Sequence, residues 1–399
     1  MTSPAEPHDH LVHDSVGPAI TGVEAGATIG VGMNSLLMIG VMPVILGALA
    51  DEHRLSAAGI GQAAMLELLG MGVATALAGA LLRLNHLKWI GVVASIALAI
   101  IDLATTQASG LEVLALRTAA GEVEGVLLWI TVGMIVRTVT PERWAGVFFT
   151  AQTLAQLLLA IILAAWVMPR FGANGGFAAL AIASVMGVVP ALASPSRLAP
   201  LPVAPGEGGA PPPRGWIALV ATVIYVAAGG AVGVYLEPLA HQAGLGAGVA
   251  QTALWTSLAA QVAGGAAATA MAGRVRYFTV FIISSAIYLG VWCAFSLREP
   301  GWLFISVNAL AGLGGLFLAP FQVPMMIDAD PSRRAAMQSG AAQLIGGALG
   351  PLLASRVVSD ADAHGVLWLG CALLLAGLAI IAWLRFTTRP SPRSSFASG

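Results

Sequence analysis

The chain has 399 residues, of which 58% are hydrophobic and only 9% carry a charged side chain, and its formal net charge at pH 7 is −1. A soluble domain carries about a quarter charged residues, so this composition excludes a soluble globular protein and indicates an integral membrane protein. The lack of excess positive charge argues against nucleic acid as a partner, because proteins that bind it have a basic surface.

Residues 1–20 are polar, contain proline and include no Lys or Arg. A secretory signal needs a basic segment before its apolar core, so this stretch is not one. His8, His10 and His13, with two neighbouring aspartates, offer metal-ligand chemistry. We favour a disordered N-terminal tail without a bound metal, because short polar termini are rarely held in place.

Apolar stretches of membrane-spanning length follow the tail. A helix needs about 20 apolar residues to cross a hydrocarbon core about 30 Å thick. We therefore predict an all-α integral membrane protein with twelve transmembrane helices, at residues 24–48, 57–82, 89–107, 111–137, 143–168, 173–194, 216–239, 248–272, 278–297, 302–327, 335–357 and 364–386.

The basic residues orient these helices, because Lys and Arg concentrate in cytoplasmic loops. If the N-terminus is cytoplasmic, most of the 18 basic residues fall in cytoplasmic loops, and Arg117 lies within the membrane. The opposite loops receive only Arg54, Arg170, Arg298 and Arg356. We therefore expect both termini to be cytoplasmic.

A proline- and glycine-rich segment divides the predicted helices into two groups of six. Residues 195–215 contain seven prolines and four glycines, which predicts a flexible cytoplasmic linker. The expected organisation is a tail at 1–20, six-helix bundles at 21–194 and 216–388, and a C-terminal tail at 389–399. Residues 50–62 and 240–251 share a weak motif, which indicates that the second bundle repeats the first.

The fourth predicted helix places charge inside an apolar stretch. Arg117 and Glu124 are seven residues apart and so lie on nearly the same helix face, whereas Glu122 is more than a quarter-turn away. A charge at membrane depth costs about 2.5–3.5 kcal/mol on insertion scales, so one that persists usually faces a bundle interior or a water-filled path. These residues therefore predict a functional site.

The six-plus-six pattern, the central linker and Arg117-x3-Gly121 resemble the major facilitator superfamily of secondary transporters, over residues 20–388. In that family the arginine of R-x-x-x-G is associated with proton coupling. The family's charged loop motif after the second helix is altered here, because Arg83 stands in place of an aspartate and His86 in place of a glycine. The resemblance therefore does not extend to the charge relay of that loop.

The fifth predicted helix bears on the direction of transport. Drug/proton antiporters of the family carry G-x3-G-P there, but residues 145–160 contain no Gly-Pro pair. This departure tips our expectation toward uptake, with efflux as the alternative. A Gly346-x3-Gly350-Pro351 run does occur in the eleventh helix, where we favour a proline kink with close glycine packing.

Acidic residues of neighbouring helices are expected to complete the coupling site. Glu67 is the one charged residue of the second helix, and it either carries the coupling proton or serves as a structural counter-ion to Arg117. Asp102 of the third helix is expected to be a packing charge that pairs with Arg117. The predicted proton-coupling residues are Glu67, Arg117, Glu122 and Glu124.

The resemblance implies a substrate cavity between the two bundles near the bilayer midplane. Polar and aromatic residues of the helices expected to line it are the predicted substrate-binding residues: Asn34, Phe149, Gln152, Gln156, Tyr225, Tyr235, Glu237, Gln251, Trp255, Asn308, Gln322 and Gln343. For each there is a structural alternative, such as an amide that joins two helices, an aromatic at the membrane interface or a solvated helix end.

We therefore expect a proton-coupled secondary transporter of a small organic solute that acts as a monomer in the inner membrane of a bacterium. No phosphate-binding loop and no nucleophile paired with a base occur in the sequence, so we expect neither an ATP-driven pump nor an enzyme. No repeated filter motif suggests a channel. Cys293 and Cys371 lie in apolar stretches, so we expect packing roles for them and no metal or cofactor.

Overall fold

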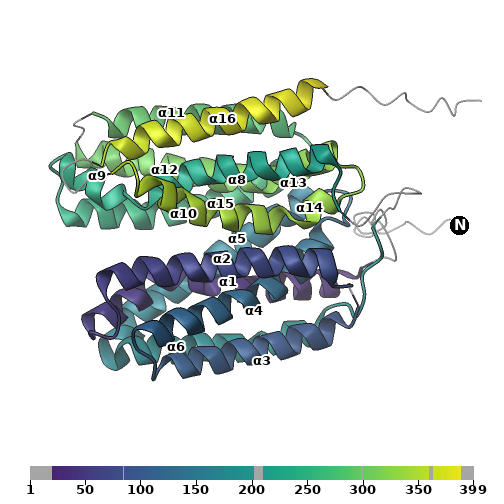
Figure 1. Cartoon of the computed structure of the whole chain (residues 1–399), viewed down its shortest axis with the longest axis horizontal. Helices are drawn as coiled ribbons and strands as arrows, with labels where there is room; N and C mark the ends of the chain where they lie inside the picture. Colours follow the sequence, from purple (N-terminus) through teal and green to yellow (C-terminus); the bar gives the residue numbers. More distant parts are fainter. Residues whose placement is uncertain (1–19, 84, 202–209, 298–299, 359–362, 388–399) are drawn as a thin grey trace, which may run out of the picture.

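The computed structural model describes residues 20–83, 85–201, 210–297, 300–358 and 363–387. His8, His10 and His13, in the predicted N-terminal tail, lie outside the described residues. Figure 1 shows long helices lying side by side in two groups, with the N-terminal helices in the lower half and the C-terminal helices in the upper half.

The N-terminal group consists of α1 (Gly22–Asp51), α2 (Ala57–Leu81), α3 (Leu87–Thr105), α4 (Leu111–Ile135), α5 (Pro141–Ile162), the π-helical turn η1 (Leu163–Val167), α6 (Met168–Met186) and α7 (Val188–Ala193). Local interactions and backbone conformation explain where two of these helices begin or break. Thr21 and Glu24 form a reciprocal capping box at the start of α1. The left-handed backbone of Gly172, with φ +57°, breaks the helical path inside α6.

The C-terminal group consists of α8 (Pro213–Gly233), α9 (Leu236–Gln242), α10 (Ala247–Met271), α11 (Tyr277–Phe295), α12 (Gly301–Leu318), the 3-10 turn η2 (Ala319–Phe321), α13 (Gln322–Ala329), α14 (Arg334–Met337), α15 (Ser339–Ala354) and α16 (Gly365–Thr387). Pro351 lies inside α15. Gly346 and Gly350 press against the backbone of α8, which is the close glycine packing favoured for this run.

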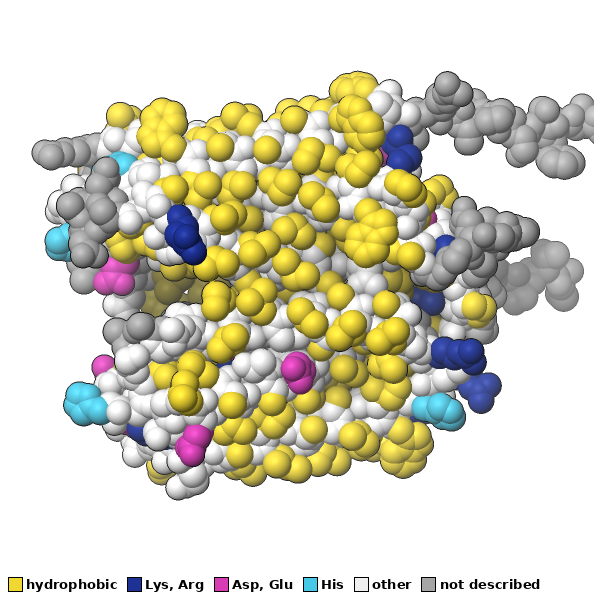
Figure 2. Space-filling view, in the orientation of Figure 1, with side chains coloured by type: hydrophobic (Ala, Val, Ile, Leu, Met, Phe, Trp, Pro, Cys, Tyr) yellow, Lys and Arg dark blue, Asp and Glu magenta, His cyan; other side chains and the backbone are white. Residues whose placement is uncertain are grey.

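Hydrophobic side chains cover most of the lateral surface in Figure 2, and most of the basic side chains in view gather at the right-hand end of the molecule. This distribution suits a lipid environment, because hydrocarbon cannot solvate charge, and helices satisfy their own backbone hydrogen bonds. The chain is therefore an all-α, multi-pass membrane protein.

Helix is present in each of the twelve ranges predicted from the sequence. By length and apolar composition, nine stretches of the described residues qualify as membrane spans. One of these stretches, Pro141–Ala193, has 53 residues and includes α5, η1, α6 and α7. The count of twelve spans and the cytoplasmic location of both termini stay predictions.

Helix contacts define where the two groups meet. Within the N-terminal group α2 packs along α4, and within the C-terminal group α10 packs along α12 and α8 along α15. Between the groups, α2 lies against α15 and α5 lies against α10. Two features follow from this arrangement: a cluster of buried charges inside the N-terminal group and a cavity between the groups.

Candidate functional site

The buried charge cluster centres on Arg117, whose side chain is fully buried in α4. Its Nη2 donates to Asp102 Oδ1 at 2.9 Å and to Thr105 Oγ1 at 3.1 Å, and its Nη1 lies 3.5 Å from Glu67 Oε1. The guanidinium stacks over the ring of Phe177, 5.0 Å from its centroid. The arginine therefore bridges carboxylates from α2 and α3, and the pairing expected for Asp102 is present.

Two glycines of α4 allow this bridge to form. A Cβ at Gly121 would strike the backbone carbonyl of Glu67, and a Cβ at Gly125 would strike that of Met71. Small residues at this spacing let helix backbones approach closely in membranes. The glycine of R-x-x-x-G thus brings α2 near enough for Glu67 to reach Arg117.

Glu124 completes the cluster from two turns further along α4, about 10.5 Å from Arg117 along the helix axis. Its side chain is 2% exposed, and its Oε2 has no hydrogen-bond partner, as is also true of Glu67 Oε2. One cation thus shares a buried site with three carboxyl groups. Uncompensated buried charge is costly, so the cluster is neutral only when two of its carboxyl groups hold protons.

The structure does not bring Glu122 into the cluster. Its side chain is exposed, whereas that of Glu124 is buried. Two residues correspond to about 200° around a helix, so neighbours at this spacing face nearly opposite sides. Of the four predicted coupling residues, Glu67, Arg117 and Glu124 face the buried interior together.

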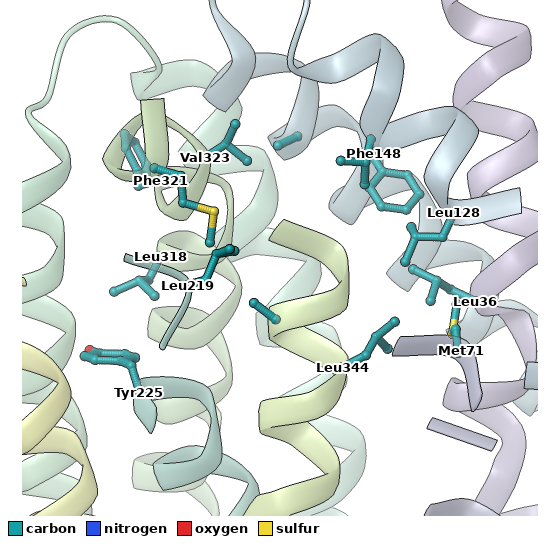
Figure 3. Packing of buried hydrophobic residues seen from close by; sticks show 14 of the residues in the cluster. Leu36, Met71, Leu128, Phe148, Leu219, Tyr225, Leu318, Phe321, Val323 and Leu344 are labelled. Carbon is teal, nitrogen blue, oxygen red and sulfur yellow. The ribbon is translucent and has the colours of Figure 1, made fainter. Parts of the chain in front are cut away.

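A cavity of about 470 Å³ lies between the two helix groups. Figure 3 shows part of its apolar wall, where Leu36, Leu128 and Phe148 of the N-terminal group lie across from Leu318 and Val323 of the C-terminal group. Six of the predicted substrate-binding residues line this cavity: Phe149, Gln152, Tyr225, Asn308, Gln322 and Gln343.

Two predicted amides instead join helices inside the N-terminal group. Asn34 is buried and donates from Nδ2 to Ser95 Oγ at 3.3 Å. Gln156 is buried and donates from Nε2 to the carbonyl of Leu36 at 2.5 Å. Neither residue lines the cavity, because each amide faces a neighbouring helix of its own group.

Four further predicted residues lie away from the cavity. Tyr235 precedes α9, and the side chains of Glu237 and Gln251 are exposed at the surface. Trp255 of α10 packs against an apolar cluster of the N-terminal group. The cavity is also lined by Tyr288, Ser257 and Ser339, which the sequence reasoning did not select. A tyrosine well inside an apolar span was the available signal for Tyr288.

The two groups are tied together at one end, which we call the linker end, where α4 ends and α15 begins. Arg333 donates from Nη1 to the carbonyls of Val136 at 2.5 Å and Thr138 at 2.9 Å. Gln338 donates to the carbonyl of Ala76 at 3.3 Å. The cation thus meets carbonyls at the C-terminus of α4, where the helix dipole favours positive charge.

Arg137 adds a second contact between the groups at the linker end. It donates to the carbonyls of Gly133 and Ala199, and its Nη1 lies 3.3 Å from Met337 Sδ. Burial, together with the nearby charge of Arg333, lowers the pKa of Arg137 to about 10, so the guanidinium stays charged at neutral pH. At the opposite end, near α9, Figure 2 shows a hollow between the two halves.

Arg333→Ala is expected to loosen the linker end. Each charge-assisted hydrogen bond contributes about 1.5–3 kcal/mol, so losing two of them should shift the opening equilibrium by at least tenfold. The readout is the rate of maleimide labelling of a Ser339→Cys variant in a background without Cys293 and Cys371, because Ser339 lines the cavity at this end. Arg83→Ala, an exposed arginine at the same end, is the control. Equal labelling rates in Arg333→Ala and the parent would show that the Arg333 hydrogen bonds do not keep the linker end closed.

No protein-family model and no curated protein sequence matches the chain. The chain is, however, similar in structure to proteins whose structures have been solved. A major facilitator superfamily transporter, FucP, in the outward conformation has a TM-score of 0.69 at 12% identity, covering 92% of this chain and 98% of that one. The human organic anion transporter MFSD10 (TETRAN) has a TM-score of 0.69 at 14% identity, covering 90% of this chain and 99% of that one. Likeness over this much of each chain shows that the protein has the fold of the major facilitator superfamily transporters.

Proposed function

We propose that this protein is a secondary active transporter that moves a small organic solute across the membrane by alternating access, driven by protons. The observation that carries the proposal is the buried cluster of Arg117 with Glu67, Asp102 and Glu124. Both similar structures are transporters by their descriptions. The expected class is therefore a carrier rather than a channel or an enzyme.

The cluster lies where it can influence the cavity. Glu124 is one helical turn before Leu128, which lines the cavity. The two residues are therefore about 6 Å apart along the axis of α4. Glu67 belongs to α2, which packs against α15 of the other group. Proton binding in the cluster can therefore affect both the cavity and the contact between the groups.

In the proposed cycle, a proton taken up by Glu124 or Glu67 changes which carboxylates remain to pair with Arg117. The arginine then reorganises between Glu67 and Asp102, and the packing of α2 against α4 and α15 changes with it. Arrangements with different pairings favour opening at different ends, and the proton gradient selects between them by mass action. The contacts at the linker end and the hollow near α9 support an outward-facing arrangement as one state of this cycle.

The direction proposed is uptake across a bacterial inner membrane, by a protein that acts as a monomer. It rests on the absence of a Gly-Pro pair from residues 145–160. A transport assay in proteoliposomes, run with the proton gradient in each direction, distinguishes uptake from efflux by antiport. The description of MFSD10 names an organic anion, but no basic side chain occurs among the described residues that line the cavity here. We therefore do not extend that substrate class to this chain.

The test is transport in proteoliposomes with and without an inward proton gradient. Glu124→Gln and Glu67→Gln should abolish accumulation against a gradient, while solute exchange and binding persist in part, because each amide keeps the size of the side chain but cannot carry a proton. Glu122→Gln is the matched control, since it lies two residues from Glu124 with an exposed side chain. Accumulation that is unchanged in Glu124→Gln and Glu67→Gln would remove both acids from the mechanism.

A further inference from the structure

The described part of the cavity wall consists of apolar and uncharged polar residues. Among the described residues that line it, none is Asp, Glu, Lys, Arg or His. Its polar groups are amides and hydroxyls, including Gln152, Gln261, Gln322 and Gln343. The charged cluster lies outside this lining, so the solute site and the charged site are separate.

Two amide oxygens in the lining have unused hydrogen-bonding capacity. Gln322 is 3% exposed, and its Oε1 has no partner. Gln152 Oε1 is also buried without a partner. Each oxygen has almost no accessible surface, so the amide must rotate toward the cavity before a solute can donate to it. An unpaired buried acceptor is costly and gains most from a ligand that supplies an N–H or O–H donor.

Two other polar groups of the wall already have partners. Asn308 donates from Nδ2 to the carbonyl of Ala253 at 2.9 Å, and the hydroxyl of Tyr225 lies 2.9 Å from Ser285 Oγ. The buried lining atoms without a partner are acceptors, one at Gln322 from the C-terminal group and one at Gln152 from the N-terminal group. A solute that donates to both would contact both halves of the protein.

We propose that the transported solute is an uncharged molecule with at least two hydrogen-bond donors, for Gln322 and Gln152, and with an apolar or aromatic part that packs against Phe149. This inference rests on the proposed function, because it assigns the substrate of the same carrier. A carboxylate or an ammonium group would enter a site without an opposite charge and lose its hydration there. The cavity volume of about 470 Å³ lies within the range of small-molecule sites.

One consequence concerns the electrical balance of transport. If the solute is neutral and the coupling ion is a proton, each uptake step carries a net positive charge inward. A membrane potential that is negative inside should then drive accumulation even without a pH difference. The charge that moves is that of the proton bound by the coupling cluster, and the solute contributes none.

The test compares solutes that share a scaffold and differ at one functional group, which is neutral, acidic or basic. Purified full-length protein in detergent at pH 7 is screened by thermal shift against matched sets, each built on one scaffold as a primary alcohol, a carboxylate and an amine, or as a primary amide, a carboxylate and an amine. Phenyl β-glucoside, phenyl β-glucuronide and phenyl 6-amino-6-deoxy-β-glucoside form one such set. The neutral member is expected to give the largest shift in sets where any member binds.

Variants locate the binding site. Gln322→Leu should weaken the best neutral compound at least tenfold, and Gln152→Leu provides a second, independent measurement should Gln322→Leu not fold. Gln107→Leu makes the same change at an exposed position and should leave the affinity unaltered. Gly229→Phe should abolish the shift, because Gly229 lines the cavity and a Cβ there would meet only the Tyr288 hydroxyl, at 3.9 Å.

Larger increases in unfolding temperature with the carboxylate or amine members would overturn the inference. It would also be overturned if no compound raised the unfolding temperature of the wild type more than that of Gly229→Phe. Unchanged affinity in both Gln322→Leu and Gln152→Leu would overturn it as well. Binding in detergent needs no gradient, so these outcomes are independent of proton coupling. If a neutral compound binds but is not accumulated in proteoliposomes, the proposed function fails while the assigned ligand class stands.

Discussion

Arg117→Ala is expected to lower the free energy of unfolding by about 3–5 kcal/mol and to abolish proton-driven accumulation. Removing one partner of a buried ion pair leaves the other buried without compensation, which is the costly way to break it. Here the loss affects Asp102 at 2.9 Å and Glu67 at 3.5 Å, together with the hydrogen bond to Thr105. The measurements are the thermal unfolding midpoint in detergent and uptake in proteoliposomes.

The control for this prediction is Arg170→Ala. Arg170 has an exposed side chain that donates to the carbonyl of Trp166 within its own helical segment, so its removal should change both readouts little. Arg117→Lys should recover part of the stability but not the transport, because an ammonium group cannot extend two arms to two carboxylates. Equal unfolding midpoints for Arg117→Ala and Arg170→Ala would show that the cluster does not hold the bundle together.

Gly121→Ala is expected to destabilise the protein by about 1–3 kcal/mol and to lower coupled transport at least tenfold. A methyl group there meets the backbone carbonyl of Glu67, which cannot swing aside like the end of a flexible side chain. The α2 helix must then move away from α4, and Glu67 moves away from Arg117. Overpacking of a well-packed site costs energy of this size. Thermal unfolding and proteoliposome uptake provide the two readouts.

Gly47→Ala is the matched comparison. Gly47 also lies inside a long helix, α1, but a Cβ there would meet nothing within 4 Å. The same substitution should therefore stabilise the protein by up to about 1 kcal/mol, since alanine has the higher helix propensity. Should the two alanine variants unfold at the same temperature, the close approach of α2 to α4 would not be the reason for glycine at position 121.

In the C-terminal group, glycines also let two helices pack closely, but no charged residues lie in these helices. A Cβ at Gly264 of α10 would strike the carbonyl of Leu313, and one at Gly312 of α12 would strike Ser257. This close pair is the counterpart of α2 and α4, but the polar residues that it contributes to the cavity are Ser257, Gln261 and Asn308, none of them charged. The difference agrees with the proposed mechanism, in which the N-terminal group would bind protons and the C-terminal group would supply most of the amides for the solute.

The sequence by itself determined the class of the protein and much of its helical layout. Apolar composition and the spacing of polar breaks predicted helix in every range where the structure has a long one, because the cost of unpaired backbone groups in hydrocarbon leaves helix as the option for such stretches. The helical period also placed Arg117 and Glu124 on one face and separated Glu122 from them. These are properties of single helices, which a sequence expresses directly.

Only the tertiary structure decided which polar residues converge. Gln152 and Gln156 are one turn apart in α5, yet Gln152 lines the cavity while Gln156 bonds to the backbone of α1. In the same way, Arg117 reaches Glu67 because glycines of α4 set the distance between α2 and α4. The rotation and separation of packed helices depend on contacts between residues far apart in the chain, and the periodicity of one helix carries no record of its neighbours.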